Sequence, residues 1–330
     1  MKKTGKFLAK CLLALMPFIM MILYTAFFPM GYMDKEYPSW KYTKEEQKGS
    51  TKLKGSGTVN TVIIGDSRAM ADLVPAGLGD DVVNLAVGGA TSVEMYYTLK
   101  DHIENVGVPE TVVIMFAPFH YSYMDNFWTR TAYFHHLKVT DVIKVYAEGR
   151  KLRADTFEDG EHDLFDLISR ILFLPDSYLP AILNSGFFGR YDENISEYDK
   201  IIEQRGHGLF GTMEGCSDLN YEANYTGMKM DGDHPLIDKY MKKILDLCRE
   251  NSVNIILSQP PMNETSYAAL DADYLSQYFN YIEGLSSYYN GGVFETSIPE
   301  YENRYFGDSS HLNEAGAEKY TAAFYERYLK

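Results

Sequence analysis

The sequence has little with which to hold a domain together covalently. Only three of its 330 residues are cysteines. Cys11 lies in an apolar N-terminal segment, so Cys216 and Cys248 can form at most one disulfide bond, and two cysteines make no disulfide framework. No internal repeat or low-complexity tract is evident. Because a chain of this length with ordinary apolar content can bury a full hydrophobic core, we expect a globular domain that needs no structural metal.

Basic residues are also scarce outside the first 30 positions. That segment holds four of the 31 basic residues and none of the 46 acidic ones, which leaves 27 basic against 46 acidic residues and a net charge of −19 on the remainder. Such a surface repels nucleic acid and anionic lipid headgroups. We therefore expect no nucleic-acid partner and a neutral or cationic substrate. Solubility of an exported domain explains the charge equally well.

The N-terminal segment has the composition of a membrane anchor. Four lysines precede an uncharged apolar stretch from Cys11 to about Phe28, and about 18 such residues can just cross a hydrocarbon core. Pro17 is tolerated in a membrane helix. The lysines favour a cytoplasmic N-terminus, which places the rest of the chain outside the cell membrane. No small-x-small site follows the stretch, which argues against the alternative of a cleaved signal peptide.

Composition changes again after this segment. Residues 31–57 are polar and rich in lysine, and they end in Lys54-Gly-Ser-Gly57, which is typical of a linker. We therefore predict a cytoplasmic stub and transmembrane helix over residues 1–30, a juxtamembrane linker over residues 31–57, and a single domain over residues 58–330.

Apolar runs with the lengths of strands alternate with helical spacing in the domain. This alternation predicts an α/β domain whose sheet is mostly parallel, has about five strands and carries helices on both faces. The predicted strands span residues 59–64, 81–86, 111–116, 253–257 and 292–294. The predicted helices span residues 93–103, 237–248, 274–285 and 313–328, the last capped by Asn313.

Residues 119–235 interrupt the alternation. They are rich in aromatic residues and show helical spacing only near residues 139–146 and 164–174. We predict that this segment is an insertion, or cap, over the functional site.

Two short motifs carry a serine, an acid and a base. Gly65-Asp66-Ser67 follows the first predicted strand, and Asp308-Ser-Ser-His311 precedes the last helix. Acyl transfer by serine needs these three roles, because a hydroxyl is a poor nucleophile until a neutral imidazole, oriented by a carboxylate, takes its proton. Functional sites of parallel sheets gather at the carboxyl ends of the strands, so we expect the two motifs to meet there.

The pattern resembles the SGNH (GDSL-type) hydrolase superfamily over roughly residues 59–120 and 236–328. The residues that carry the resemblance are Ile64-Gly-Asp-Ser-Arg68, the stretch from Asn84 to Gly89, and Asp308 to His311. The resemblance implies a flavodoxin-like three-layer fold.

It also implies a role for each motif residue. Ser67 would be the nucleophile, His311 the general base and Asp308 the partner that orients the imidazole. The oxyanion would be held by the backbone N–H of Ser67 and by one from Gly88 or Gly89. Since the loss of one oxyanion donor costs about 3–4 kcal/mol in well-studied enzymes, these glycines matter as much as the triad.

The sequence departs from the family where an asparagine usually donates to the oxyanion. The corresponding strand ends in Phe116-Ala-Pro-Phe-His120, so either His120 donates or the third donor is missing. This substitution resembles a subgroup of membrane-anchored extracytoplasmic proteins similar to DltD and to the alginate O-acetylation proteins. The resemblance implies a membrane-bound O-acyltransferase as partner and a cell-surface polysaccharide as substrate.

Each assignment has a structural alternative. Ser67 is also a residue type that caps helices, and the two glycines also suit a tight turn. His120 can pack among the aromatic residues around it, and Arg68 can pair with an acid or touch substrate. Asp66 is expected to bind the turn rather than to transfer protons.

A metal site is a weaker hypothesis. Asp231, Asp233 and His234 stand within four positions of a glycine-containing loop, a pattern more typical of a solvated turn. We expect no metal and no cofactor.

The two motifs predict serine acyl chemistry, and the resemblance implies an esterase or O-acyltransferase that acts on acyl groups, acetyl in the first place, of a cell-surface polysaccharide. The three residues do not distinguish an esterase from an O-acyltransferase, because the two activities differ only in the final acceptor of the acyl group. The alternatives are a catalytically degenerate scaffold subunit of an acylation complex and a lipase, which the acidic surface disfavours near anionic membranes.

Overall fold

A parallel sheet of five strands forms the centre of the domain. The computed structural model describes residues 2–49, 59–124, 126–152, 164–171, 189–210 and 234–330. The strand order β2-β1-β3-β4-β6 is that of flavodoxin-like doubly wound sheets. The strands are β1 (Thr61–Gly65), β2 (Val82–Asn84), β3 (Thr111–Met115), β4 (Asn254–Leu257) and β6 (Val293–Phe294).

The strands form where the sequence predicts them because their residues are apolar and β-branched. Residues 62–64 of β1, 112–115 of β3 and 255–257 of β4 are almost wholly buried. Strands with no solvent-facing side are expected when helices cover both faces of a parallel sheet. The register pairs Gly65 with Met115 and Ile114 with Leu257, so the carboxyl ends of β1, β3 and β4 lie side by side.

The helices pack in two groups against the sheet. Helix α5 (Ser92–Asn105) packs on α10 (Pro235–Glu250), and α10 packs on α12 (Ala272–Tyr289). Helix α4 (Ser67–Asp72) packs instead on α13 (Glu314–Tyr328). Asn313 caps α13 as predicted, since its side chain accepts from the N–H of Gly316. The prediction of a mostly parallel α/β domain is confirmed.

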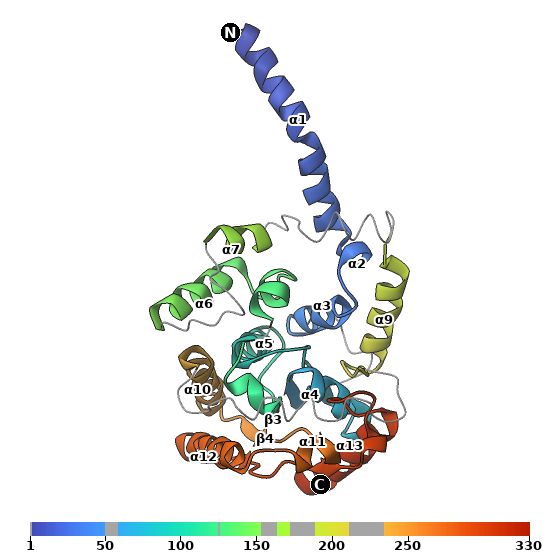
Figure 1. The fold of residues 1–330 in the computed structure, drawn as a ribbon, viewed down its shortest axis with the longest axis vertical. Coiled ribbons are helices and arrows are strands. Elements are labelled where there is room, and N and C mark those ends of the chain that lie inside the picture. The colour runs from blue at the N-terminus through green and yellow to red at the C-terminus, as the bar shows by residue number, and fades with distance from the viewer. Residues whose placement is uncertain (1, 50–58, 125, 153–163, 172–188, 211–233) are drawn as a thin grey trace.

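The N-terminal residues form three helices. Helix α1 (Lys2–Phe27) extends away from the domain in Figure 1, and α2 (Pro29–Tyr32) and α3 (Tyr37–Glu46) follow it. The linker prediction is wrong for residues 31–49, because α3 buries Trp40 and Tyr42 and packs on α9 (Tyr191–Glu203). Its buried face also includes Ser39, Thr43 and Glu46, while its lysines are partly exposed. Residues 50–57 lie outside the described residues.

The predicted membrane-spanning character of residues 1–30 is not confirmed. Within the described part of the chain, no helix is both long and apolar enough to span a bilayer.

The segment predicted as an insertion runs between the neighbouring strands β3 and β4. Its described parts include α6 (Val139–Leu152) and α7 (Leu164–Ile171), which match the two predicted helical patches, and α9, which the sequence did not predict. A π-helical turn (Phe127–Ala132) precedes α6. Together with α5 and α10, this turn and helices α6 and α7 bury a second hydrophobic cluster around Trp128.

Smaller elements complete the fold. They are the parallel pair β5 (Met262–Asn263) and β7 (Glu300–Tyr301), helix α11 (Glu264–Ala268), and short 3-10 turns at Pro75–Gly77, Pro118–Tyr121 and Asn303–Tyr305. Cys11 and Cys248 are free thiols. Because the Cys248 thiol is free, the possible Cys216–Cys248 bond finds no support; Cys216 itself lies outside the described residues.

Candidate active site

Ser67 is the first residue of α4, and only Asp66 separates it from the end of β1. Asp66 caps the helix, because its side chain accepts from the N–H of Arg68. The capping alternative for Ser67 is therefore wrong, and the serine hydroxyl is available for other contacts. Gly65 must be glycine, since a Cβ there would lie 1.8 Å from the Met115 carbonyl oxygen. The turn that presents Ser67 depends on this close approach of β1 and β3.

The two predicted motifs meet in a hydrogen-bonded chain. Ser67 Oγ lies 2.7 Å from Nε2 of His311, which is 244 positions away in the sequence. Nδ1 of the same ring lies 2.9 Å from both carboxylate oxygens of Asp308. A proton on Nδ1 that is held by the carboxylate leaves Nε2 free to accept the serine proton. Ser67, His311 and Asp308 thus have the arrangement of a nucleophile, a base and an orienting acid.

Backbone N–H groups hold the Asp308 carboxylate in position. The N–H groups of Ser310 and His311 both donate to Asp308 Oδ1 at 2.8 Å. Burial raises the pKa of the Asp308 carboxyl, but its hydrogen bonds with His311 and these N–H groups bring the pKa below its ordinary value. Asp308 is therefore ionised at neutral pH and can stabilise an imidazolium.

A buried carboxyl that the sequence analysis missed attaches the histidine loop to α4. Asp72 Oδ1 accepts from the N–H of Leu312 at 3.0 Å. Asn263 Nδ2 also donates to the carbonyl of Ser309 at 2.8 Å. The Asp72 bond joins the loop around His311 to the helix that begins at Ser67, and the Asn263 bond joins the same loop to β5. The only sequence signal for Asp72 is a lone acid among the apolar residues of α4.

Asp66 joins the ends of β1 and β3. Its Oδ2 accepts from the Ala117 N–H at 2.9 Å and lies 2.8 Å from Nδ1 of His120 and 3.2 Å from the Arg68 guanidinium. Burial raises the pKa of this carboxyl, but Arg68, His120 and the Ala117 N–H together hold it well below its ordinary value. The expected structural role of Asp66 is confirmed.

The same contacts decide between the alternatives for His120 and Arg68. The His120 ring packs against Phe119, with centroids 4.2 Å apart, and directs Nδ1 to Asp66. Arg68 is nearly buried and pairs with Asp66 instead of pointing at a substrate. Both residues therefore hold the turn that carries Ser67. The predicted oxyanion donation from His120 has no support in these contacts.

The second motif forms a loop beside Ser67. The Asn84 side chain joins this loop to α4 and to Leu73 after it. It donates to the carbonyls of Ala69 and Leu73 and accepts from the Ala86 N–H. Val87 N–H donates to the Gly65 carbonyl, which brings the two glycines that follow to the end of β1.

The two glycines are required for different reasons. Gly89 has a left-handed φ of +68°, which favours glycine. At Gly88 a Cβ would lie 2.4 Å from Oε2 of Glu36. In the described residues, the N–H groups of Ser67, Gly88 and Gly89 have no acceptor. Three backbone donors are thus available beside the serine hydroxyl, as an oxyanion site requires.

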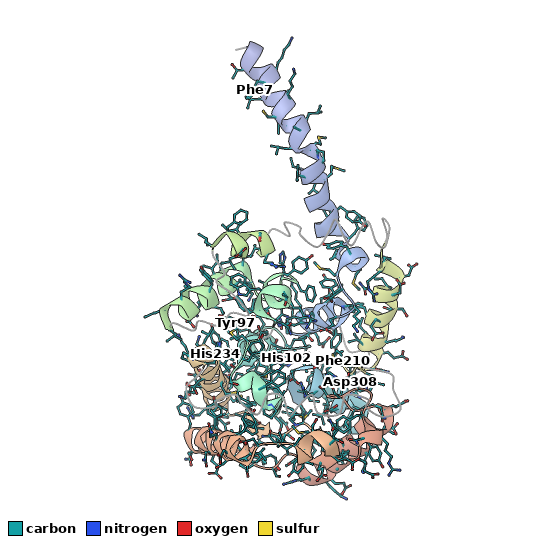
Figure 2. All side chains as sticks on the ribbon, viewed as in Figure 1. Phe7, Tyr97, His102, Phe210, His234 and Asp308 are labelled. Carbon is teal, nitrogen blue, oxygen red and sulfur yellow. The ribbon has the colours of Figure 1, made fainter. Side chains whose placement is uncertain are left out.

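A pocket of about 760 Å³ opens beside the triad. Phe210 forms one wall and stacks on the His311 ring, with centroids 4.7 Å apart. Figure 2 shows Phe210 next to Asp308. Residues of α9 and Phe210, both from the segment predicted as a cap, line this pocket. The sequence missed Glu36 and Phe210 because neither belongs to a motif. Pocket residues from four parts of the chain include Lys35, Glu36, Met70, Arg190, Phe210 and Asp308.

A metal site finds no support in the described residues. They contain no cluster of three potential metal ligands. His234 caps α10, with Nδ1 3.4 Å from the Ile237 N–H. Asp231 and Asp233 lie outside the described residues.

Comparisons with known proteins assign no family to this chain. No protein-family model matches it, and no curated protein matches its sequence significantly. The fold and site by themselves define a flavodoxin-like α/β domain that carries a Ser-His-Asp arrangement at the carboxyl edge of its sheet.

Proposed function

We propose that this protein is an SGNH-type serine esterase or O-acyltransferase that acts on acyl groups of a cell-surface polysaccharide through an acyl-serine intermediate. The observation that carries the proposal is the 2.7 Å contact between Ser67 Oγ and His311 Nε2, with Asp308 on the other ring nitrogen.

The reaction follows from these contacts. As Ser67 Oγ bonds to the ester carbonyl carbon, its proton passes to His311 Nε2. The carbonyl oxygen becomes an oxyanion that the N–H groups of Ser67, Gly88 and Gly89 can hold. The imidazolium, stabilised by Asp308, then gives its proton to the leaving alcohol as the ester bond breaks. Water or a sugar hydroxyl reverses these steps and frees the serine.

The site has a feature that suits transfer to a sugar. Phe210 covers one face of the His311 ring, and the adjoining pocket is large enough for a saccharide unit. Shielding of the imidazole limits the access of water from that side. A polysaccharide hydroxyl would enter through the pocket and compete with water for the acyl-serine. Acetyl is the acyl group that we propose.

The location that we propose is outside the cell membrane, with α1 as a single-pass tether and a membrane-bound O-acyltransferase as partner. The apolar side chains of α1 are exposed, for example Phe7 at 67% and Leu13 at 73%, and the helix projects from the domain (Figures 1 and 2). Exposed apolar surface of this extent favours burial in lipid or in a partner. Removal of residues 1–27 should move the protein from the membrane fraction to the supernatant.

The test of the chemistry is a fluorophosphonate label followed by mass spectrometry. We expect an adduct on Ser67 in the wild-type protein and none in Ser67→Ala, which should also lose hydrolysis of p-nitrophenyl acetate. The melting temperature of the variant controls for folding. If both proteins are equally inert and both support polymer acylation in cells, the protein is a scaffold subunit instead.

A further inference from the structure

Glu36 lies at the loop that carries the proposed oxyanion donors, although it belongs to no motif. Its Oε2 occupies the space that a side chain at position 88 would need, since a Cβ there would be 2.4 Å away. Gly88 has no left-handed φ, so its backbone does not call for glycine. The Glu36 carboxylate therefore accounts for the absence of a side chain at this position.

The position of Glu36 is fixed from several parts of the chain. An Arg130 guanidinium N–H donates to Glu36 Oε1 at 2.7 Å, and the Glu36 N–H donates to Asp34 Oδ1 at 2.9 Å. Asn194 of α9, which is almost wholly buried, donates to the carbonyls of Met30 and Met33 just before this residue. The carboxylate is thus held in place before any substrate binds.

Glu36 lines the pocket, and one oxygen of its carboxylate has no hydrogen-bond partner among the described residues. Glu36 lines the same pocket as Asp308 and Phe210, and its side chain is 17% exposed. Oε1 is paired with Arg130, whereas Oε2 accepts no hydrogen bond from the described residues. Burial raises the pKa of the Glu36 carboxyl, and the charges of Arg130 and, to a smaller extent, of His311 partly offset this rise. An open acceptor therefore stands within electrostatic reach of the catalytic base.

We propose that Glu36 Oε2 binds a hydroxyl group of a neutral saccharide, close to the ester that Ser67 attacks. The inference rests on the proposed function and adds a specificity residue to it. A carboxylate accepts strongly from a hydroxyl, because hydrogen bonds to charged groups are about twice as strong as neutral ones. The same charge repels an anionic sugar. A site built to bind a substrate hydroxyl discriminates strongly against an analogue that lacks it.

The test compares two esters. We measure kcat and KM of Glu36→Gln on a monoacetylated methyl hexoside, which has free hydroxyls, and on p-nitrophenyl acetate, which has none. We expect kcat/KM on the hexoside to fall about tenfold or more, mainly through KM, which corresponds to one hydrogen bond to a charged group. On p-nitrophenyl acetate the change should stay within about threefold, since Gln fills the same volume at the Gly88 loop.

A matched control is Glu295→Gln, which removes the same group from another Glu–Arg pair, where Arg327 donates to Glu295 Oε1 at 2.8 Å. This variant should leave kcat/KM unchanged on both esters. Equal losses of Glu36→Gln on both esters, or no loss on either, would overturn the inference.

A binding measurement separates this inference from the proposed chemistry. In a Ser67→Ala background, which cannot form an acyl-serine, the hexoside should bind measurably by calorimetry, and Glu36→Gln should weaken binding about tenfold or more. Failure of the hexoside to bind overturns the inference even if p-nitrophenyl acetate is hydrolysed by the wild-type protein. Absence of a fluorophosphonate adduct on wild-type Ser67 would instead contradict the proposed function, and the binding result would still decide the role of Glu36.

Discussion

The carboxylate of Asp72 accepts a hydrogen bond from the backbone N–H of Leu312 at 3.0 Å. This bond joins the helix that begins with the nucleophile to the loop that carries the base. It spans 240 positions of sequence and is fully buried. The distance between Ser67 and His311 therefore depends on a contact outside the triad.

Two substitutions of Asp72 should distinguish the effect of its hydrogen bond to Leu312 from the effect of its charge. Asp72→Ala leaves the buried Leu312 N–H without an acceptor, which we expect to cost about 1–3 kcal/mol of unfolding free energy and to lower kcat. Asp72→Asn keeps an acceptor and should retain most of the activity. Urea unfolding together with p-nitrophenyl acetate kinetics measures both effects. Equal activity of the two variants would contradict a positioning role.

The pH dependence of Asp72→Asn gives a further test. Burial raises the pKa of the Asp72 carboxyl well above its ordinary value, although the Leu312 N–H partly offsets this. The contribution of such a group to stability is fully present below the unfolded pKa, near 3.9, and is lost as pH rises through the folded pKa. Asp72→Asn should therefore be more stable than the wild-type protein at pH about 8, with a smaller difference at pH about 5. A difference independent of pH would show that the carboxyl does not ionise.

Asp308→Asn should abolish most of the activity while leaving the fold intact. An amide at this position favours the wrong tautomer of His311, so Nε2 can no longer accept the serine proton, and the same change in a serine protease lowers kcat about 10⁴-fold. Burst kinetics with p-nitrophenyl acetate and a thermal melt provide the measurements. A loss of less than about tenfold would show that Asp308 is not the orienting acid.

Loss of Arg130 should slow the reaction, because it leaves the Glu36 carboxylate uncompensated. Arg130→Met leaves a negative charge beside Gly88, where the oxyanion develops, so we expect kcat on p-nitrophenyl acetate to fall about tenfold. Adding Glu36→Gln should restore most of the activity, because the uncompensated charge is then gone. A double-mutant cycle measures this coupling. Additive effects of the two substitutions would contradict the electrostatic explanation.

Acid should destabilise the domain through buried histidines. Burial lowers the pKa of His102 to about 4 and that of His136 to about 3, with nearby lysines adding to the shift of His136. For groups whose folded pKa is depressed, stability is fully present above the unfolded pKa, near 6.5, and is lost as pH falls toward the folded pKa. His102 is labelled in Figure 2. As pH falls from about 6.5 to about 5, protonation of His102 in the unfolded state should lower the free energy of unfolding by about 1.5 kcal/mol.

The difference between the wild-type protein and His102→Leu isolates this effect. Buried carboxyls such as Asp72 titrate with the opposite sign, but they are common to both proteins and cancel in the comparison. The unfolding free energy of His102→Leu should therefore fall less steeply with acid. Parallel pH profiles of the two proteins would contradict the assignment.

Local sequence was sufficient for the sheet and for the triad. The apolar, β-branched residues of β1 and β3 form strands in most contexts that bury both faces, and the turns after them place Ser67 and the glycines at one edge. Asp308 and His311 could be predicted because they stand only three positions apart in sequence, which keeps the carboxylate and the imidazole within hydrogen-bond reach of each other. The parallel order of the sheet then brings them to Ser67.

Other features depended on contacts between distant segments. Residues 31–49 looked like a linker because polar side chains outnumber apolar ones, yet Trp40 and Tyr42 are buried against residues far along the chain. His120 and Arg68 each had several suitable partners in the sequence. Only the three-dimensional distances to Asp66 showed which one each residue binds.

The sequence by itself determined which chemical groups the protein carries and the order of its strands and helices, because strand and helix formation follows from local patterns of apolar residues. Tertiary structure alone decided what surrounds the serine: the carboxylate of Glu36, the ring of Phe210 and the buried bond from Asp72. The physical reason is that a hydrogen bond or a ring contact depends on separation in space, and residues hundreds of positions apart carry no local signal of it.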